Sequence, residues 1–210
     1  YNRTASRVEI IQLRGGIDLE NPTEPHGFGK LYKVTDNMEE ALRDADIVMV
    51  IVPSTAHYDV AKAAAPFLRD DHIVILNPGR TGGTLEFRFT LIQQNCTTNP
   101  IIAEAETFLF ASRSEGPSQA KIFRIKEAVP LAALPATRTA EVLEAIRPVL
   151  PQFIDGKNVL QTGLNNMGAI FHPALALLNA GWIEATSGYF EFYVDGVTPS
   201  VAKVLEVLDR

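Results

Sequence analysis

The sequence contains a run of six apolar residues, Ile47–Val52, most of which are β-branched, and Pro53 ends the run. Such a run is typical of a strand that is buried on both faces of a sheet. Similar short runs follow at 73–76 and 101–103, and amphipathic stretches separate them. This alternation predicts βαβ units and a mainly parallel α/β sheet.

Further elements are expected around this sheet. Apolar spacing and end signals predict helices at 6–14, 36–43, 56–68, 83–94, 139–149, 164–179 and 198–208. Short strands are expected at 17–19 and 31–34, which a loop joins, and at 108–110 and 122–125 at the edge of the main sheet. After Gly163 the pattern becomes almost wholly helical. We therefore expect a sheet domain over 1–160 and the beginning of a helical domain over 161–210.

Composition narrows the class of protein. The 210 residues include 19 basic and 25 acidic side chains, and the net charge of −6 argues against a nucleic-acid partner. A single cysteine, Cys96, forms no internal disulfide and is typical of a reducing compartment, so a cytoplasmic protein is predicted. No apolar run reaches the roughly 20 residues that a membrane helix needs, so no membrane association is expected.

The first four residues, Tyr1-Asn2-Arg3-Thr4, look like the carboxyl end of a strand that enters a helix. At this point of a dinucleotide-binding fold an acidic side chain binds the ribose of NAD, whereas an Arg accommodates the 2′-phosphate of NADP. Asn2, Arg3 and Thr4 are therefore predicted to bind NADP, with NAD as the alternative cofactor. The competing interpretation of Arg3 is a solvated N-terminal side chain.

The glycine fingerprint of such a fold, G-x-G-x-x-G, does not occur in the sequence. Only Gly27-Phe28-Gly29 approaches it, and this stretch falls in a predicted loop. The chain also begins with Tyr rather than Met. The first strand, glycine turn and helix of a dinucleotide-binding fold are therefore expected upstream of Tyr1.

Two strand ends are predicted to lie side by side at the carboxyl edge of the sheet, where ligands bind in open α/β folds. Gly79 is interpreted as the place where the backbone approaches a flat ring, and Arg80 with 81–83 is suited to bind an anion at the start of the next helix. Ordinary strand-to-helix turns are the alternative. The cofactor contacts predicted at this edge are Val52, Pro53, Ser54, Asn77, Pro78, Gly79 and Glu106.

A second candidate site lies in the apolar helix predicted at 164–179. Asn165, Gly168 and His172 are three and seven residues apart, so they are expected to share one helix face. Amide and imidazole groups on an otherwise apolar helix need partners or a ligand. A His that titrates near neutrality can exchange a proton with a carbonyl or imine, while the alternative is a hydrogen-bonded core histidine.

Other polar residues carry weaker signals. Arg113 follows a predicted strand together with Glu104 and Glu106, and it is suited to hold a carboxylate or to form a surface salt bridge. His57 is interpreted as a helix-surface residue, with a ligand contact as the alternative. The four histidines show no metal-ligand spacing, so no metal site is predicted.

Taken together, these motifs resemble the octopine/nopaline (opine) dehydrogenases over nearly the whole chain. The motifs that carry the resemblance are the opening 1–4, VPSTAH at 52–57, NPGRTGG at 77–83, Glu106-Thr107, Asn165-Asn166 and FHP at 171–173. The resemblance implies a Rossmann-type domain followed by an all-helical domain. It also implies an NAD(P)H-dependent reductive condensation of an amino acid with a 2-oxo acid. In this interpretation His172 is the catalytic acid/base, and the substrate-binding residues are Asn165, Asn166, Arg80 and Arg113.

The sequence departs from the family in two respects. The glycine fingerprint and the downstream Asp that orients the family's catalytic His have no counterpart in these 210 residues. The chain alone is therefore expected to be inactive. The apolar tail is expected to be covered by further helices or by the second subunit of a homodimer.

Two other classes of protein compete with this interpretation. Dehydrogenases of the 2-hydroxy-acid, ketopantoate or glycerol-phosphate type usually employ a Lys, and the absence of lysine between Lys157 and Lys203 favours a His-based site. A non-catalytic nucleotide-binding module, whose helical tail assembles subunits, is the second alternative.

Overall fold

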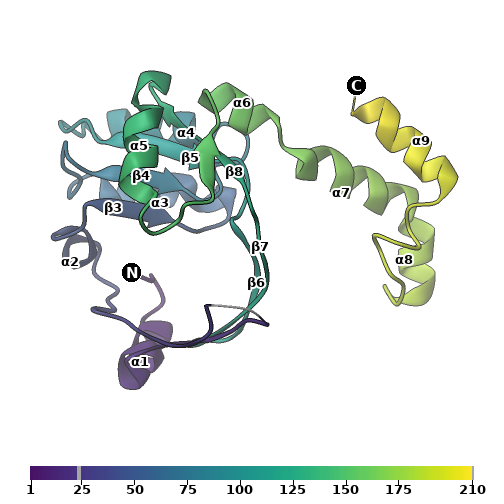
Figure 1. The fold of residues 1–210 in the computed structure, drawn as a ribbon, viewed down its shortest axis with the longest axis horizontal. Helices are drawn as coiled ribbons and strands as arrows, with labels where there is room; N and C mark the ends of the chain where they lie inside the picture. The colour runs from purple at the N-terminus through teal and green to yellow at the C-terminus, as the bar shows by residue number, and fades with distance from the viewer. Residues whose placement is uncertain (23–24, 210) are drawn as a thin grey trace. The chain divides into compact units, whose positions relative to one another are not determined.

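A five-stranded sheet forms the centre of the first of two compact units, Tyr1–Leu164. The computed structural model of the chain describes residues 1–22 and 25–209. In order across the sheet, the strands are β3 (Ile47–Val50), β4 (Ile73–Leu76), β5 (Ile101–Ala105), β8 (Val129–Leu134) and β9 (Phe153–Asp155). Every neighbouring pair is parallel except β5 and β8. The predicted mainly parallel α/β sheet is therefore confirmed (Figure 1).

Helices cover both faces of this sheet because its central strands are apolar on both sides. Along β4, Ile75 packs into one core with residues of α5, while Val74 and Leu76 pack into a second core with residues of α3 and α4. This alternation is the two-residue period of a strand. The helices of this unit that flank the sheet are α2 (Met38–Leu42), α3 (His57–Ala64), α4 (Gly83–Gln93), α5 (Thr139–Ile146) and α6 (Val159–Leu164), with short 3₁₀ turns at Ser54–Ala56 and Ala136–Arg138.

The run at 47–52 is not buried as predicted. The strand ends at Val50, its first three residues are only half-buried, and Ile51 is 61% exposed. The physical reason is that β3 is the outermost strand of the sheet in the described part of the chain, so one edge of it has no neighbouring strand. The β-branched composition identified a strand correctly but did not show its position in the sheet.

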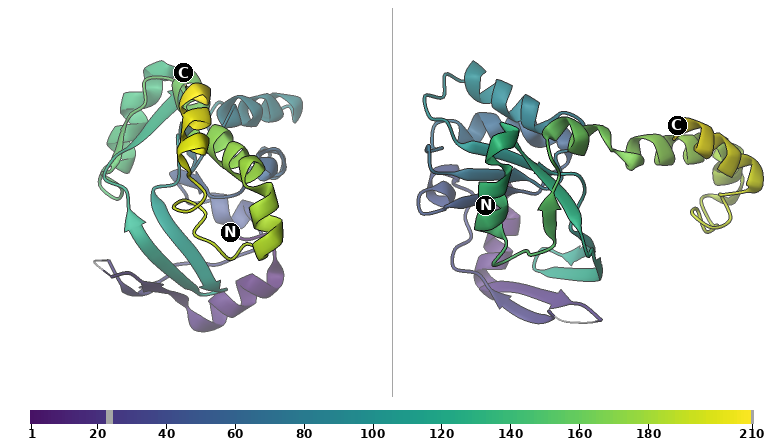
Figure 2. Two further views of the ribbon diagram at one scale, coloured as in Figure 1. Left: turned by 90° about the vertical axis from the view of Figure 1, so that its right-hand side faces the viewer. Right: turned by 45° about the horizontal axis from the view of Figure 1, so that its top comes forward.

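A second sheet of four strands was not predicted. It has the order β2 (Gly27–Lys30), β1 (Gly16–Glu20), β7 (Gln119–Ile125) and β6 (Phe110–Gly116), and α1 (Ala5–Arg14) precedes it. Figure 2 shows the β6–β7 hairpin running from the main sheet towards β1 and α1. The ladder joins segments about a hundred residues apart in the chain, such as Leu19 opposite Ala120. Such distant pairing leaves no local signal in the sequence.

Three predictions about these segments are therefore wrong. Residues 31–34 are not a strand, and the strand lies earlier, where Gly27–Lys30 pairs with β1 rather than forming a loop. Residues 108–110 and 122–125 do not extend the edge of the main sheet, because β6 and β7 belong to the second sheet. The predicted loop before β2 includes residues 23–24, which lie outside the described residues.

Gly15 ends α1 in the left-handed conformation, as predicted.

The second unit, from Asn165 onward, is helical. It contains α7 (Met167–Leu178), α8 (Ala180–Thr186) and α9 (Pro199–Leu208). The buried Asn179 amide donates hydrogen bonds to the carbonyls of Leu175 and Gly196, which ties α7 to the segment before α9. The α9 prediction is confirmed, with Thr198 as its N-cap and Pro199 in its first turn. No helix in the described part of the chain is long and apolar enough to cross a membrane.

The helix predicted at 164–179 is interrupted. Helix α6 ends at Leu164, and α7 begins at Met167 after the non-helical Asn165 and Asn166. Asn165 therefore does not share a helix face with Gly168 and His172, and that prediction is wrong. The contacts within the chain separate the two units after Leu164, while the predicted functional division near residue 160 stays a prediction.

Two strands of the main sheet, β8 and β9, also escaped prediction. Arg138 is the N-cap of α5, and its side chain makes no capping hydrogen bond. Thr139 is instead buried, and its Oγ1 accepts a hydrogen bond from the backbone N–H of Ala133 on β8 at 3.0 Å. Thr139 thus joins the helix to the sheet.

We expect Thr139→Val to lower the free energy of unfolding by about 1–3 kcal/mol, because it leaves the buried Ala133 N–H without an acceptor. Thr137→Val, at an exposed position two residues earlier, is the matched control and should stay within about 0.5 kcal/mol of the parent chain. Urea unfolding measures both. Equal stabilities for the two variants would contradict this role of Thr139.

Candidate active site

The loops after β3, β4 and β5 adjoin at the carboxyl edge of the main sheet. The backbone N–H of Asn77 donates to the carbonyl of Val50 at 2.9 Å, and that of Gly79 donates to the carbonyl of Ala105 at 3.0 Å. These bonds extend the parallel ladder past the ends of the strands. The predicted side-by-side arrangement of the first two strand ends is confirmed, and the segment at 106–108 lies beside them.

A cavity of about 850 Å³ lies along β3 and brings the N-terminal segment next to the end of that strand. Its walls include Asn2, Arg3, Thr4, Val52 and Pro53. Five of the predicted cofactor residues therefore come together, whereas Ser54, Asn77, Pro78, Gly79 and Glu106 are not among the residues that line this cavity.

Local hydrogen bonds shape the N-terminal wall of the cavity. The N–H of Asn2 donates to the carbonyl of Thr35, and the side-chain oxygen of Asn2 accepts from the N–H of Thr4. Thr4 is the N-cap of α1, and its own side chain makes no capping bond. The first turn of α1 carries no acidic residue. The Arg3 side chain is exposed at this helix start, where a negative group would be stabilised.

The buried carboxyl group of Glu104 connects the end of β5 to α4 and α6 through hydrogen bonds. Its side chain is 1% exposed, and one oxygen accepts hydrogen bonds from both the N–H and the hydroxyl of Thr84, at 3.0 and 2.7 Å. The other oxygen accepts from the Thr162 hydroxyl at 2.8 Å. Burial raises the pKa of Glu104, and these three hydrogen bonds oppose that shift.

Two glycines make room for this carboxyl group. A Cβ atom at Gly79 would collide with the Glu104 side chain, and one at Gly163 would lie 3.3 Å from its Oε1. The packing of Glu104 thus explains why position 79 is a glycine. The predicted close approach of this backbone to a flat ring stays a prediction. An anion site was predicted at 81–83, at the start of α4. In the structure a carboxylate of the chain itself caps this helix start, because Glu104 accepts a hydrogen bond from the Thr84 N–H.

His57 is buried rather than on the helix surface, so that interpretation is wrong. Its ring lies against Gly83, where an added Cβ would be 3.1 Å away, and neither ring nitrogen has a hydrogen-bond partner of good geometry. Burial lowers the pKa of His57, while Glu86 and the Pro78 carbonyl act in the opposite direction. A neutral imidazole therefore packs beneath the 77–83 loop.

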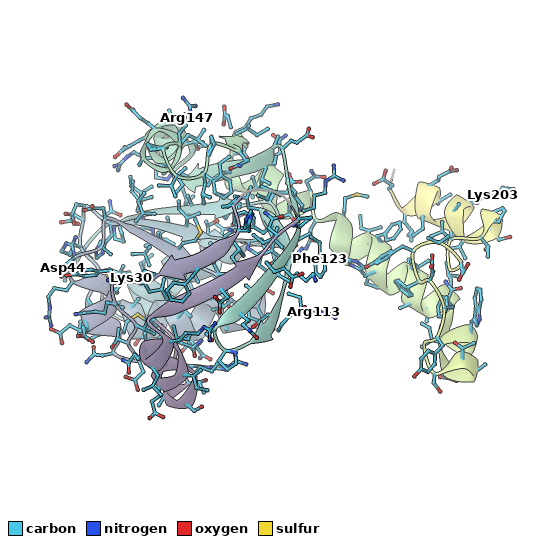
Figure 3. The ribbon with its side chains drawn as sticks, turned by 60° about the horizontal axis from the view of Figure 1, so that its bottom comes forward. Lys30, Asp44, Arg113, Phe123, Arg147 and Lys203 are labelled. Atoms are coloured by element: carbon cyan, nitrogen blue, oxygen red, sulfur yellow. The ribbon has the colours of Figure 1, made fainter. Side chains whose placement is uncertain are left out.

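Two cations flank the turn that follows β5. The Arg80 guanidinium lies over the Phe108 ring, 5.7 Å from its centroid, and the Lys126 ammonium donates a hydrogen bond to the Thr107 hydroxyl at 2.9 Å. Lys126 was not predicted as a site residue, because it comes after β7 and no motif surrounds it. Arg113 is exposed on β6 opposite Lys121 and belongs to the second sheet (Figure 3).

In the second unit, His172 lies on α7 with both ring nitrogens engaged. Nδ1 is 3.1 Å from the Gly168 carbonyl, and Nε2 is 2.9 Å from the Tyr193 hydroxyl. A carbonyl only accepts, so Nδ1 carries a proton, and in the neutral ring Nε2 accepts from Tyr193. His172 is exposed within these 210 residues.

The remaining predicted residues of this unit lie before the helix. Asn165 is exposed, and Asn166 is the half-buried N-cap of α7. No group of three or more metal-ligating side chains occurs among residues 1–22 and 25–209.

Comparison with known proteins identifies relatives of this chain. Residues 155–210 match the family described as NAD/NADP octopine/nopaline dehydrogenase, alpha-helical domain. The chain is 38% identical over 205 residues to an opine dehydrogenase of Arthrobacter sp. (strain 1C), a match that covers 98% of this chain and 56% of that protein. The chain thus spans little more than half the length of this curated relative. The predicted family resemblance is confirmed.

Solved structures share the fold. Apo yersinopine dehydrogenase superposes with a TM-score of 0.76 at 16% identity, covering 98% of this chain and 52% of the other. An octopine dehydrogenase solved with NADH and pyruvate gives 0.70 at 21% identity, covering 85% and 48%. A ketopantoate reductase from Ralstonia eutropha gives 0.63 at 16% identity, covering 97% and 60%. The predicted Rossmann-type fold followed by a helical domain is confirmed.

Glu104 gives a testable pH dependence of stability. Because its pKa in the folded chain is raised above the ordinary value of 4.5, the folded state binds the proton more tightly than the unfolded state. The stability that this group contributes is fully present below pH 4.5 and is lost as the pH rises through the raised pKa. Glu104→Gln removes this titration, so its stability relative to the parent chain should increase as the pH rises.

Urea unfolding at stepped pH measures this difference. Burial also lowers the pKa of His57 and of His72, so both contribute to the pH dependence of stability. Both residues are present in the variant and in the parent chain, so their contributions cancel in the comparison. Glu144→Gln, at an exposed position on α5, is the control and should show a curve parallel to that of the parent chain. A parallel curve for Glu104→Gln would contradict the assignment.

Proposed function

Since this chain is a relative of the octopine/nopaline dehydrogenases, we propose that it serves the NAD(P)H-dependent reductive condensation of an amino acid with a 2-oxo acid. The observation that carries the proposal is the 38% identity to an opine dehydrogenase over 98% of this chain. We further propose that 1–160 forms the cofactor domain and that 161–210 begins the helical substrate domain. The match of 155–210 to the family's helical domain supports this division.

The cofactor residues proposed in the first unit are chemically suited to a dinucleotide. The cavity beside β3 places Arg3, Asn2 and Thr4 at the start of a helix without acidic first-turn residues, an arrangement that favours a phosphate group. This supports NADP over NAD. Val52 and Pro53 would line the same cavity, and Ser54, Asn77, Pro78, Gly79 and Glu106 would continue along the carboxyl edge. When bound, the reduced nicotinamide supplies the hydride.

The substrate class is proposed from the relatives together with the local charges. Octopine dehydrogenase has been solved with NADH and L-arginine, with NADH and agmatine, and with NADH and pyruvate. In this chain Arg80 offers a half-buried guanidinium to a substrate carboxylate. Asn165 and Asn166 are proposed to bond polar substrate atoms. Arg113, which is exposed on β6, stays a prediction for the same task.

His172 is proposed as the acid/base. With its Nδ1 proton bonded to the Gly168 carbonyl, the ring has one nitrogen, Nε2, at which a proton is gained or lost. Tyr193 contacts this nitrogen at 2.9 Å, and its hydroxyl can either donate or accept, so it follows both protonation states. The reduction of an imine consumes one proton together with the hydride, and His172 would deliver it.

Two attributes of the whole protein also remain proposals. The exposed apolar side chains of the second unit, such as Leu177 and Trp182, support cover by further helices or by a second subunit. The single thiol of Cys96 supports a cytoplasmic location.

Activity is tested by mixing the protein that carries this chain with NADPH or NADH, pyruvate and a panel of amino acids, and following the absorbance of the reduced nicotinamide. We expect oxidation that requires both substrates. In His172→Gln we expect kcat to fall by about 10²–10⁴-fold with unchanged cofactor affinity. Absence of oxidation with every amino acid would refute the proposed reaction, and full turnover in the variant would refute the role of His172.

The cofactor preference is tested at Arg3. Arg3→Asp should shift the ratio of NADPH to NADH affinity towards NADH by about tenfold or more, because it removes a charge-assisted contact to the 2′-phosphate and adds repulsion. Lys203→Asp, at an exposed position on α9 that does not line this cavity, reports the effect of net charge alone. Isothermal titration with both nucleotides measures the ratio, and an unchanged ratio in Arg3→Asp would argue against the NADP assignment.

A further inference from the structure

Arg80 and Lys126 come from distant parts of the chain and meet at one short turn, Glu106–Phe108. Arg80 is held by the loop after β4, whose Gly79 N–H bonds to the Ala105 carbonyl. The backbone of Lys126 is held beside this turn by a hydrogen bond, in which its N–H donates to the Leu109 carbonyl at 3.1 Å. Their side chains then contact adjacent residues, Phe108 and Thr107. The two cations therefore lie on the same turn at the carboxyl edge of the sheet.

Neither cation is neutralised by an ion pair. Both side chains are half-buried, and among the described residues no carboxylate lies within salt-bridge distance of Arg80 or Lys126. Burial lowers the pKa of Lys126, the charge of Arg80 lowers it further, and Glu106 opposes this. The turn thus carries two cations that have no ion-pair partner, although the whole chain is acidic.

The surrounding groups offer hydrogen-bond donors suited to a carboxylate. The half-buried Arg80 guanidinium lies over the Phe108 ring, and no hydrogen bond joins it to another residue in the described part of the chain. Lys126 has three N–H donors, of which Thr107 takes one. A guanidinium and an ammonium that converge on one anion give charge-assisted hydrogen bonds.

We propose that Lys126 and Arg80 together form the binding site for the carboxylate of the 2-oxo acid, with Lys126 as a substrate-binding residue. This inference rests on the proposed function for the identity of the substrate. Lys126 takes the place that the sequence assigned to Arg113 as the second cation. Arg113 pairs across the ladder with Lys121 on the second sheet, and no described contact brings it to the Glu106–Phe108 turn.

Binding of pyruvate to the 210-residue chain tests the proposal without cofactor or turnover. The probe is pyruvate itself, titrated into chain labelled for NMR at lysine side chains and backbone amides. We expect the Lys126 side-chain signal and the Thr107 and Phe108 amides to shift with one common affinity. If the protein lacks the proposed activity while these signals shift, the proposed function fails and this binding site stands.

Variants separate charge from packing. Lys126→Met should weaken pyruvate binding by about tenfold or more, whereas Lys126→Arg should restore most of it because the charge returns. Lys121→Met is the matched control, since it lies five residues earlier on β7 and pairs with Glu20, and it should bind pyruvate as the parent chain does. If Lys126→Met does not fold, the shifts of the parent chain decide. Wild-type affinity in a folded Lys126→Met, or no shift at Lys126 in the parent chain, would overturn the proposal.

Discussion

A carboxyl group that has no access to water must be held by hydrogen bonds, and in this chain that requirement falls on Glu104 at the end of β5. Its three donors come from Thr84 at the start of α4 and from Thr162 on α6. One side chain thus joins a central strand, the helix after the 77–83 loop, and the last helix of the first unit. The two glycines at 79 and 163 follow from it, because larger residues would press on the carboxyl group. Glu104 therefore constrains the backbone at Gly79, the residue that precedes Arg80.

The chemistry proposed for this chain is divided between its two units. The first unit provides the carboxyl edge, where Arg80 and Lys126 contact the same turn. Because the chain as a whole is acidic, these local charges rather than the net charge are proposed to attract an anion. The second unit provides His172, whose tautomer is fixed within its own helix by the Gly168 carbonyl. Each unit prepares its part through hydrogen bonds internal to itself.

The sequence predicted the elements whose signals are local. The strand Ile73–Leu76 was predicted with correct bounds because its apolar run ends at a proline turn, and α9 because Thr198 and Pro199 mark its start. The second sheet escaped because β1 pairs with β7 across the chain. For the same reason Lys126 was missed, and Glu104 and His57 were undervalued, since burial and partners come from packing. The family motifs identified the carboxyl edge, but they did not show which cation accompanies Arg80.

We propose that the loops after β3, β4 and β5 bind the nucleotide and the 2-oxo acid at one edge of the sheet. A crystal structure of the protein soaked with NADP⁺ and pyruvate tests it most directly. We expect density for the adenosine phosphate beside Arg3 and for the pyruvate carboxylate between Arg80 and Lys126. Nucleotide density away from the cavity beside β3, or a pyruvate carboxylate that contacts neither cation, would contradict it.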